Sequence, residues 1–198
     1  MKRLAFALVT LVCGLLLSAA PAIAQQPLLI KPLAEKKVAD LPPGPLYWRI
    51  ENFADRAQAQ AAEGAWSLVA ESAGKTWLFT LGAPGGSTAG GTKVTELGPI
   101  PRVAAPQYLL RINEASGPPG SATPIHTHPG SEAFFVLSGE QSIRGPQGTV
   151  RVEAGHAVAG QGGGMPMQVS SSGSTDLHAL VMFVVDGTRP FSSPAKFP

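Results

Sequence analysis

Two histidines and one glutamate lie within seven residues, in the stretch His126-Thr127-His128-Pro129-Gly130-Ser131-Glu132. Side chains alternate along an extended strand, so we expect His126 and His128 to project to the same face. Pro129-Gly130 has turn chemistry, which would reverse the chain so that Glu132 begins the next strand. Two imidazoles and one carboxylate that converge in this way form an N,N,O set for a divalent metal, with positions left open for water or substrate.

The surroundings of Glu132 indicate that this cluster is enclosed. Glu132 shares strand parity with Phe134 and Val136, so we expect this face to look into an apolar interior. An unpaired carboxylate buried there costs several kcal/mol, so the cluster needs a cation or a partner that shares a proton. A metal-free binding barrel that keeps the three residues as a polar patch is the alternative.

Apolar patterning predicts the elements that position these residues. Short apolar or alternating runs, punctuated by Gly and Pro, predict many strands and favour an all-β sandwich or barrel. One short helix is expected over residues 54–63, with Asn52 as its N-cap and Gly64 after its end. The expected strands are 46–50, 66–71, 76–81, 93–97, 108–113, 132–137, 149–152, 167–170 and 178–185.

The stretch 120–139 resembles the first sequence motif of the cupin superfamily. Gly120 is followed by five residues and His126, then by one residue and His128; three residues lead to Glu132, and six more to Gly139. The resemblance implies a type-2-like, single-domain cupin: an all-β double-stranded β-helix, which is a jelly-roll barrel with its site inside. An N-terminal extension with the short helix is expected to pack on this barrel.

The second cupin motif departs from the family pattern. Gly155 fits its first glycine, but Gln-Gly-Gly-Gly at 161–164 stands where the family has Pro-x-Gly. The position of the fourth ligand, a histidine in the family, falls on Pro166, or on Met167 if the glycine run absorbs one extra residue. We favour Met167, a soft and weak ligand that would act as a distant fourth. The alternative is a metal with three protein ligands and Met167 in the barrel core.

Other polar residues have both a functional and a structural interpretation. His178 shares strand parity with apolar residues; it could supply the missing nitrogen at the cavity mouth or be an ordinary hydrogen-bonded strand histidine. His156 follows Gly155 and is expected in a surface turn. Arg111, Asn113 and Gln141 could hold a substrate, although solvated strand faces would explain them equally well.

Charge excludes some classes of partner. The chain has 15 Lys and Arg against 13 Asp and Glu, a net charge of +2. Both excess cations, Lys2 and Arg3, lie at the extreme N-terminus, so residues 25–198 carry 13 of each sign. A nucleic-acid binder or a polybasic membrane binder is therefore not expected.

The first residues have the pattern of a secretory signal. Met1-Lys2-Arg3 precedes the apolar run 4–17 and small residues that end at Ala24. We expect cleavage after Ala24 and a periplasmic or secreted protein with no membrane association afterwards; an uncleaved anchor is the alternative. Cys13 is the one cysteine of the chain, so the processed protein would have no disulfide and no thiolate site.

These expectations divide the chain into five segments. They are a signal peptide (1–24), an extended tether (25–45), strands and a short helix packed on the barrel (46–100), the cupin barrel (101–187) and a C-terminal tail across the surface (188–198).

The resemblance implies a divalent metal held by His126, His128 and Glu132, with Fe, Mn, Zn, Cu and Ni not distinguished. Dioxygenase-like chemistry on a small oxygenated molecule is the first hypothesis, because this donor set with vacancies suits non-haem Fe(II). A non-enzymatic small-molecule binding or sensing barrel is the second hypothesis, and a structural module of an envelope assembly is the third. Cupins commonly pair their barrels, so a homodimer is expected.

Overall fold

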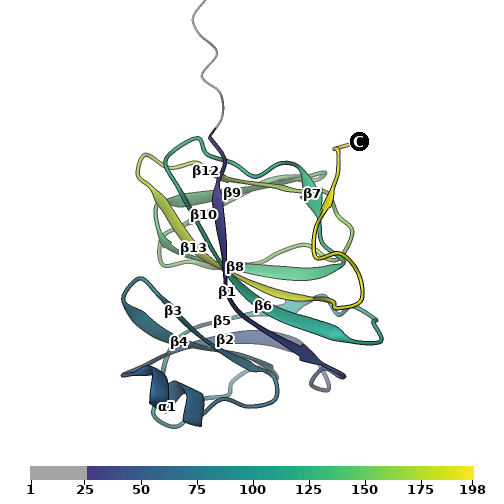
Figure 1. Ribbon diagram of the computed structural model, residues 1–198. Helices are drawn as coiled ribbons and strands as arrows, with labels where there is room; N and C mark the ends of the chain where they lie inside the picture. Colours follow the sequence, from purple (N-terminus) through teal and green to yellow (C-terminus); the bar gives the residue numbers. More distant parts are fainter. Residues whose placement is uncertain (1–25) are drawn as a thin grey trace, which may run out of the picture.

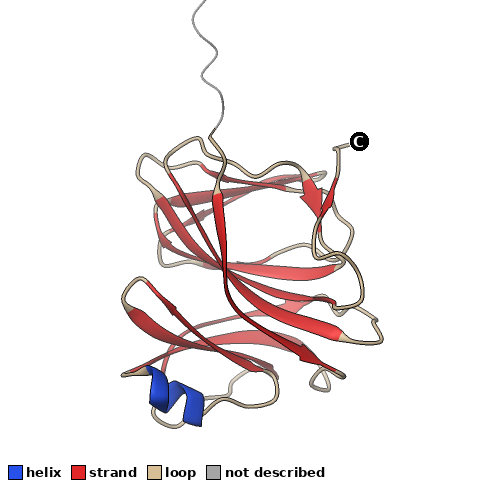
Figure 2. Ribbon diagram, in the orientation of Figure 1, coloured by secondary structure: helices blue, strands red, loops and turns tan. Residues whose placement is uncertain are grey.

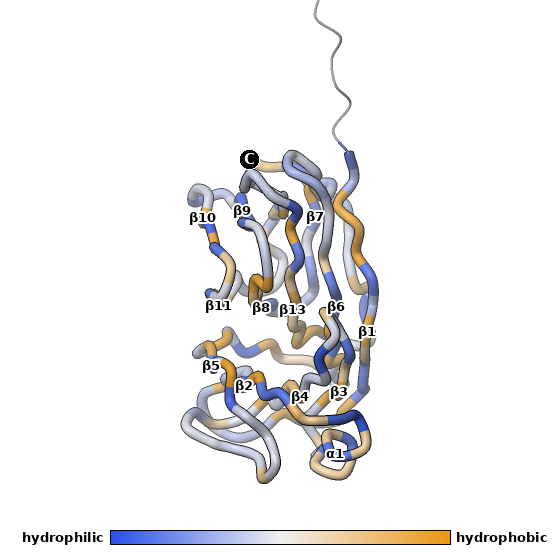
Figure 3. Tube along the Cα trace, turned by 90° about the vertical axis from the view of Figure 1, so that its left-hand side faces the viewer, coloured by the Kyte–Doolittle hydropathy of each residue, from blue (hydrophilic) through white to orange (hydrophobic). Residues whose placement is uncertain are grey.

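The computed structural model describes residues 26–198, so the predicted signal segment 1–24 and Cys13 lie outside the described residues. Strands make up most of the fold, with one short helix among the described residues (Figures 1 and 2). A barrel formed by two facing sheets lies on a smaller sheet that carries the helix, as the side view in Figure 3 also shows. Across residues 26–198, no helix has the length and apolar character needed to cross a membrane.

The barrel consists of two facing antiparallel sheets and one short two-stranded ribbon. A five-stranded sheet in the order β1-β6-β13-β8-β11 faces a three-stranded sheet in the order β10-β9-β12, and β7 pairs with β14. The all-β jelly-roll prediction is confirmed. The strands are β1 Leu29–Val38, β6 Tyr108–Gly117, β7 His126–Thr127, β8 Gly130–Ser138, β9 Glu140–Gly145, β10 Gly148–Glu153, β11 Ala157–Ala159, β12 Gln168–Ser171, β13 Leu177–Asp186 and β14 Ser193–Pro194.

The smaller sheet has the order β3-β4-β2-β5 and packs on the outer face of the five-stranded sheet. Its elements are β2 Leu46–Phe53, α1 Arg56–Ala61, β3 Ser67–Ser72, β4 Lys75–Gly82 and β5 Thr92–Ile100. The predicted helix is confirmed as a shorter one, and its N-cap is Asp55, whose carboxylate accepts a hydrogen bond from Gln58 N at 2.8 Å. Asn52, the expected cap, lies in β2, and its amide donates to the Thr76 carbonyl oxygen.

Strand β13 is buried on both faces, which joins the two units. Leu180, Met182 and Val184 pack with the smaller sheet, whereas the alternate residues Val181 and Phe183 pack inside the barrel. The sequence of β13, residues 177–186, is apolar almost without interruption, which is typical of a strand covered on both sides.

One expectation is corrected by the fold, and a second gains detail. The segment expected as a tether contains β1, which pairs with β6 at the edge of the five-stranded sheet. Pro32 lies at a register shift in this strand, and an edge strand tolerates a proline because one side needs no ladder hydrogen bonds. The tail expected across the surface is mainly exposed, and it also contains β14, which pairs with β7.

Candidate functional site

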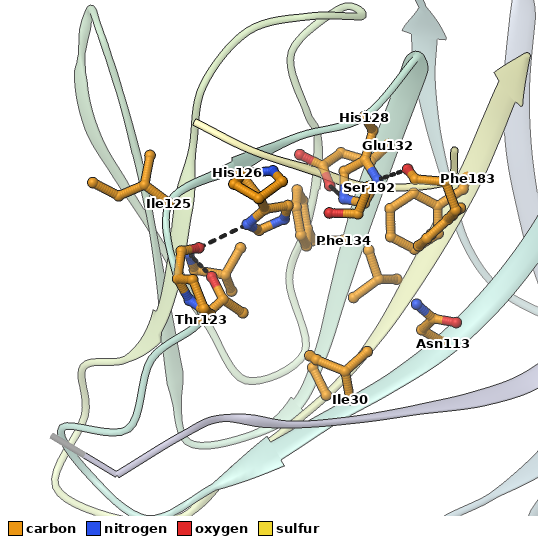
Figure 4. A pocket seen from close by; sticks show the side chains of 16 residues that line it. Ile30, Asn113, Thr123, Ile125, His126, His128, Glu132, Phe134, Phe183 and Ser192 are labelled. Carbon is orange, nitrogen blue, oxygen red and sulfur yellow. Dashed lines mark hydrogen bonds and ion pairs between the residues drawn. The ribbon is translucent and has the colours of Figure 1, made fainter. Parts of the chain in front are cut away.

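A cavity of about 340 Å³ lies inside the barrel. Its walls are mainly apolar and include Ile125, Phe134, Val181, Phe183 and Phe191. Polar side chains gather at one side, where His126, His128 and Glu132 lie close together (Figure 4). The arrangement is an apolar chamber with a small polar group at one side, which is the usual composition of a small-molecule site.

Backbone pairing and two glycines position the polar group. His126 exchanges two backbone hydrogen bonds with Met167, at 2.8 and 2.9 Å, which holds β7 against the strand opposite. Gly130 begins β8 so close to β13 that a Cβ would clash with the Val184 carbonyl oxygen. Gly160 lies against Glu132, and a Cβ there would come within 2.7 Å of the Glu132 Cγ.

In both histidines, Nδ1 bonds to a backbone carbonyl oxygen, which leaves the lone pair on Nε2. His128 Nδ1 donates to the Phe191 carbonyl oxygen at 2.6 Å, and His126 Nδ1 donates to the Pro124 carbonyl oxygen at 2.8 Å. A carbonyl oxygen only accepts, so each Nδ1 carries the hydrogen and each Nε2 is left as an acceptor or ligand atom. The two rings are 4.9 Å apart between centroids, at 85°.

Glu132 is an acid without a partner. Its Oε1 is buried and has no hydrogen-bond partner in residues 26–198, and its Oε2 lies 3.9 Å from His128 Nε2. Burial raises the pKa of Glu132 from 4.5 to about 8, and burial lowers the pKa of His128 from 6.5 to about 4. In the absence of a cation, both groups are therefore neutral near pH 7, and the pair is not a salt bridge.

The donor atoms are of the types that bind a divalent metal, but His128 Nε2 and Glu132 Oε2 lie slightly too far apart to share one ion. Two ligands that share one ion at about 2.1 Å lie roughly 3 to 3.4 Å apart, whereas His128 Nε2 and Glu132 Oε2 are 3.9 Å apart. Within the described chain, no group of three or more His, Cys, Asp or Glu side chains is gathered tightly enough to count as a formed metal site. A contraction of about half an ångström would bring this pair to ligand spacing.

A family profile described as "Cupin domain" matches residues 115–183, which include β7, β8 and both histidines. Residues 115–183 form a cupin domain. The resemblance stated from the 120–139 motif is therefore confirmed. A comparison with curated proteins found no match.

Solved structures similar to this chain include cupins and enzymes. A cupin-like protein from Thermotoga maritima is 13% identical over 44% of this chain and 65% of its own, with a TM-score of 0.40. A polyketide cyclase from Streptomyces resistomycificus is 22% identical over 45% and 62%, at 0.37. A DMSP lyase from Ruegeria pomeroyi is 23% identical over 43% of each chain, at 0.38. This chain spans less than two thirds of each of them.

The cupin cavity does not include the two candidates for a fourth ligand. Met167 contributes its backbone to the pairing with His126, but its side chain is buried in the barrel core and is not among the residues that line the cavity. His178 is on the face of β13 turned to the smaller sheet, where its Nε2 lies 3.0 Å from Ser72 Oγ and 3.0 Å from Glu114 Oε2. His156 is exposed, as expected, with its Nδ1 3.2 Å from the Ala154 carbonyl oxygen.

The three polar strand residues have separate places. Asn113 is buried and lines the cavity. Arg111 lies over the Phe191 ring, and its Nε donates to Asn113 Oδ1 at 3.0 Å. Gln141 is fully buried, and its side-chain amide has no hydrogen-bond partner in the described chain. Of these three candidates, only Asn113 is placed to touch a ligand in the cavity.

Sequence reasoning missed two contributors to the cupin site. Phe191, in the tail, supplies a wall of the cavity and the acceptor for His128. Gly160 provides the room that Glu132 occupies. Gly160 belongs to a glycine-rich stretch, which is a signal in the sequence. A single phenylalanine in a proline-rich tail gives no such signal.

Proposed function

We propose that the cupin domain binds a small, mainly apolar molecule that carries an oxygen donor, next to a divalent metal held by His126, His128 and Glu132. One observation carries this proposal: two imidazoles whose Nδ1 atoms bond to backbone carbonyls, which leaves Nε2 for a ligand, share one side of an apolar cavity with a buried carboxyl oxygen that has no partner in the described residues. Neutral imidazole and carboxylate are the ligand types that divalent transition metals take.

The residues of the site have distinct parts in this function. The two backbone acceptors of the histidine Nδ1 atoms fix the ring tautomers, which is how proteins orient imidazole ligands. Asn113 offers a polar side chain to the ligand, and the apolar walls exclude water. When bound, the metal would supply Lewis-acid or oxygen-activating chemistry, and a dioxygenase-like reaction is our first hypothesis because the donor set suits Fe(II).

The burial of Glu132 favours a cation as its partner. Without a positive charge beside it, the carboxyl keeps its proton up to about pH 8. A divalent ion would displace that proton and remove the cost of burying the carboxylate. Among Fe, Mn, Zn, Cu and Ni, the residues do not select one, so availability in the compartment would decide.

The segment 1–24 supports export as a further part of the proposal. Its charged start, apolar run and small residues before Ala24 have the order of a cleavable signal, so we propose a periplasmic or secreted protein. A homodimer stays a prediction, which analytical ultracentrifugation of the processed protein would test.

Elemental analysis of the purified protein tests the metal centre. We expect near-stoichiometric divalent metal after exposure to each of the five ions in turn, and its loss in the variant that combines His126→Ala with His128→Ala. His156→Ala is the matched control, because this histidine is exposed and lies outside the cavity. Wild-type protein that retains none of the ions, or a double variant that retains them, would overturn the proposal.

A metal-free binding barrel is the second candidate function. It is favoured by the place of Met167, whose side chain is in the core, so that three protein ligands remain. In this case a small aromatic probe such as phenol would raise the unfolding temperature of metal-stripped protein as much as that of metal-exposed protein. Stabilisation that depends on the ion would favour the first candidate.

A further inference from the structure

The C-terminal tail is anchored on both sides of Phe191. At the end of β13, Asp186 N donates to the Pro129 carbonyl oxygen at 3.0 Å. Further along, β14 pairs with β7, and Ala195 N donates to the Ile125 carbonyl oxygen at 3.0 Å. Both acceptors belong to the segment that carries the two site histidines, so the tail and the site are joined before and after Phe191.

Phe191 contacts His128 through both its backbone and its side chain. The Phe191 carbonyl oxygen accepts from His128 Nδ1 at 2.6 Å, and the two ring centroids are 4.7 Å apart at 57°. The hydrogen bond decides which ring nitrogen carries the hydrogen, and the ring contact restricts rotation of the imidazole. One residue of the tail therefore acts on both the tautomer and the orientation of His128.

The Phe191 ring is itself held in place. Arg111 Cζ lies 4.3 Å from its centroid, at cation–π distance, and the Phe183 ring packs against it at 4.9 Å and 72°. Arg111 is held in turn by Asn113 Oδ1 at 3.0 Å and by Glu35 at 3.7 Å. A chain of contacts thus runs from β1 and β6 through Phe191 to His128.

We propose that Phe191 is the positioning residue of the cavity: its carbonyl oxygen and its ring together hold His128 with Nε2 directed toward Glu132. Phe191 lies beyond the matched cupin region 115–183, so this role belongs to the tail of this chain. The inference deepens the proposed function and rests on it only where a metal is used in the test.

Loss of the Phe191 ring would release the tail from Arg111 and Phe183. The carbonyl oxygen would then no longer be kept at the His128 Nδ1, and the imidazole would exchange between its two tautomers. A ligand nitrogen that spends part of its time protonated binds a metal more weakly, and loss of such supporting contacts costs about tenfold to a hundredfold in metal affinity.

The first measurement uses metal-free protein and nitrogen-15 NMR of the histidine side chains near neutral pH. In the wild type, His128 should show a single Nδ1-protonated tautomer, with its signals assigned by their loss in His128→Gln. Phe191→Ala should shift these signals toward a tautomer mixture, and Arg111→Met, which removes the cation above the ring, should shift them part of the way. Phe191→Leu keeps a large apolar side chain in the tail, so it separates a specific effect of the ring from simple unfolding. It should give a smaller shift than Phe191→Ala.

Phe197→Ala is the matched control for these variants. Phe197 is also a tail phenylalanine beneath an arginine, with Arg144 Cζ 4.6 Å from its centroid, and it does not line the cavity. We expect its His128 signals to be those of the wild type. A shift of equal size in Phe197→Ala would assign the effect to general loosening of the tail and would overturn the proposal.

The second measurement is titration of the same proteins with Co²⁺ alone. Phe191→Ala should bind Co²⁺ about tenfold to a hundredfold more weakly than the wild type, and Phe197→Ala should bind it equally well. If wild-type protein does not bind Co²⁺ but the NMR result holds, the metal proposal fails and the positioning role stands. If wild-type and Phe191→Ala proteins bind Co²⁺ alike and show the same His128 tautomer, the positioning role is overturned.

Discussion

Two buried titratable residues, Glu132 and His128, dominate the electrostatics of the cavity. Burial pushes the two pKa values in opposite directions, to about 8 and about 4, so both groups are neutral over the same range of pH. The motif predicted that the carboxyl would be buried and would need a cation or a proton. It could not predict which ring nitrogen of His128 is free, because that depends on the carbonyl of Phe191, far along the chain.

These shifts predict how the stability of the metal-free protein depends on pH. Folded Glu132 keeps a proton that the unfolded chain releases above pH 4.5, so its contribution to stability is complete below 4.5 and is lost as the pH rises to about 8. Unfolded His128 gains a proton below pH 6.5 that the folded state refuses, so stability is also lost as the pH falls from 6.5 to about 4. We therefore expect greatest stability between pH 4.5 and 6.5.

Urea unfolding at about pH 5.5 and about pH 8 measures the alkaline loss, which should be on the order of a few kcal/mol. Glu132→Gln should remove most of it, because the amide has no proton to release. The exposed Glu153→Gln is the control and should leave the difference unchanged. An alkaline loss of the same size in Glu132→Gln would show that another group causes it.

At the scale of elements, short strands form the walls of the cavity and single glycines let them pack closely. The pattern of alternating or short apolar runs predicted most strands of the barrel and the smaller sheet, because each of these strands buries one face or both. It gave no strand over β9 or β11. It also missed β1, whose residues are mainly exposed or half-buried and include three lysines and a proline, and β14, which has only two residues. Both are edge pairings, for which the partner strand supplies information that the local pattern lacks.

Gly160 tests how tightly these elements pack around the site. A Cβ at Gly160 would come within 2.7 Å of Glu132 Cγ and 2.8 Å of its carbonyl oxygen, so Gly160→Ala should cost about 1 to 3 kcal/mol of stability by overpacking. It should also weaken Co²⁺ binding, because Glu132 must move. Gly162→Ala lies in the same run, where the added Cβ meets only Pro101 at 3.6 Å, and should change neither quantity. Equal behaviour of the two variants, measured by urea unfolding and Co²⁺ titration, would contradict this account.

The whole molecule consists of two units that meet at β13, a barrel strand whose outer face packs on the smaller sheet. The Trp77 ring on β4 meets the Phe135 ring on β8 edge-on at 6.1 Å, and Leu180 is fully buried between the two units. The sequence predicted that residues 46–100 would pack on a barrel, but it could not predict that β13 is covered on both faces. An apolar run of this kind also fits a strand inside a single barrel.

Leu180→Ala tests whether the units unfold together. We expect a loss of about 2 to 5 kcal/mol for a buried leucine and a single transition. Tryptophan fluorescence reports Trp48, Trp66 and Trp77, which all lie within residues 46–100. It should have the same urea midpoint as the NMR signals of His126 and His128 in the barrel. Two separate midpoints in the wild type would show that the smaller sheet is an independent unit.

The pairing of β14 with β7 has a practical consequence for anyone who handles this protein. Because residues 193–195 are bonded to the strand that carries His126, an affinity tag fused after Pro198 would begin a few residues from the cavity. An oligohistidine tag there would bring foreign imidazoles to the chamber and could capture the cation that an assay sets out to detect. Tag-free material is the right reference for every titration.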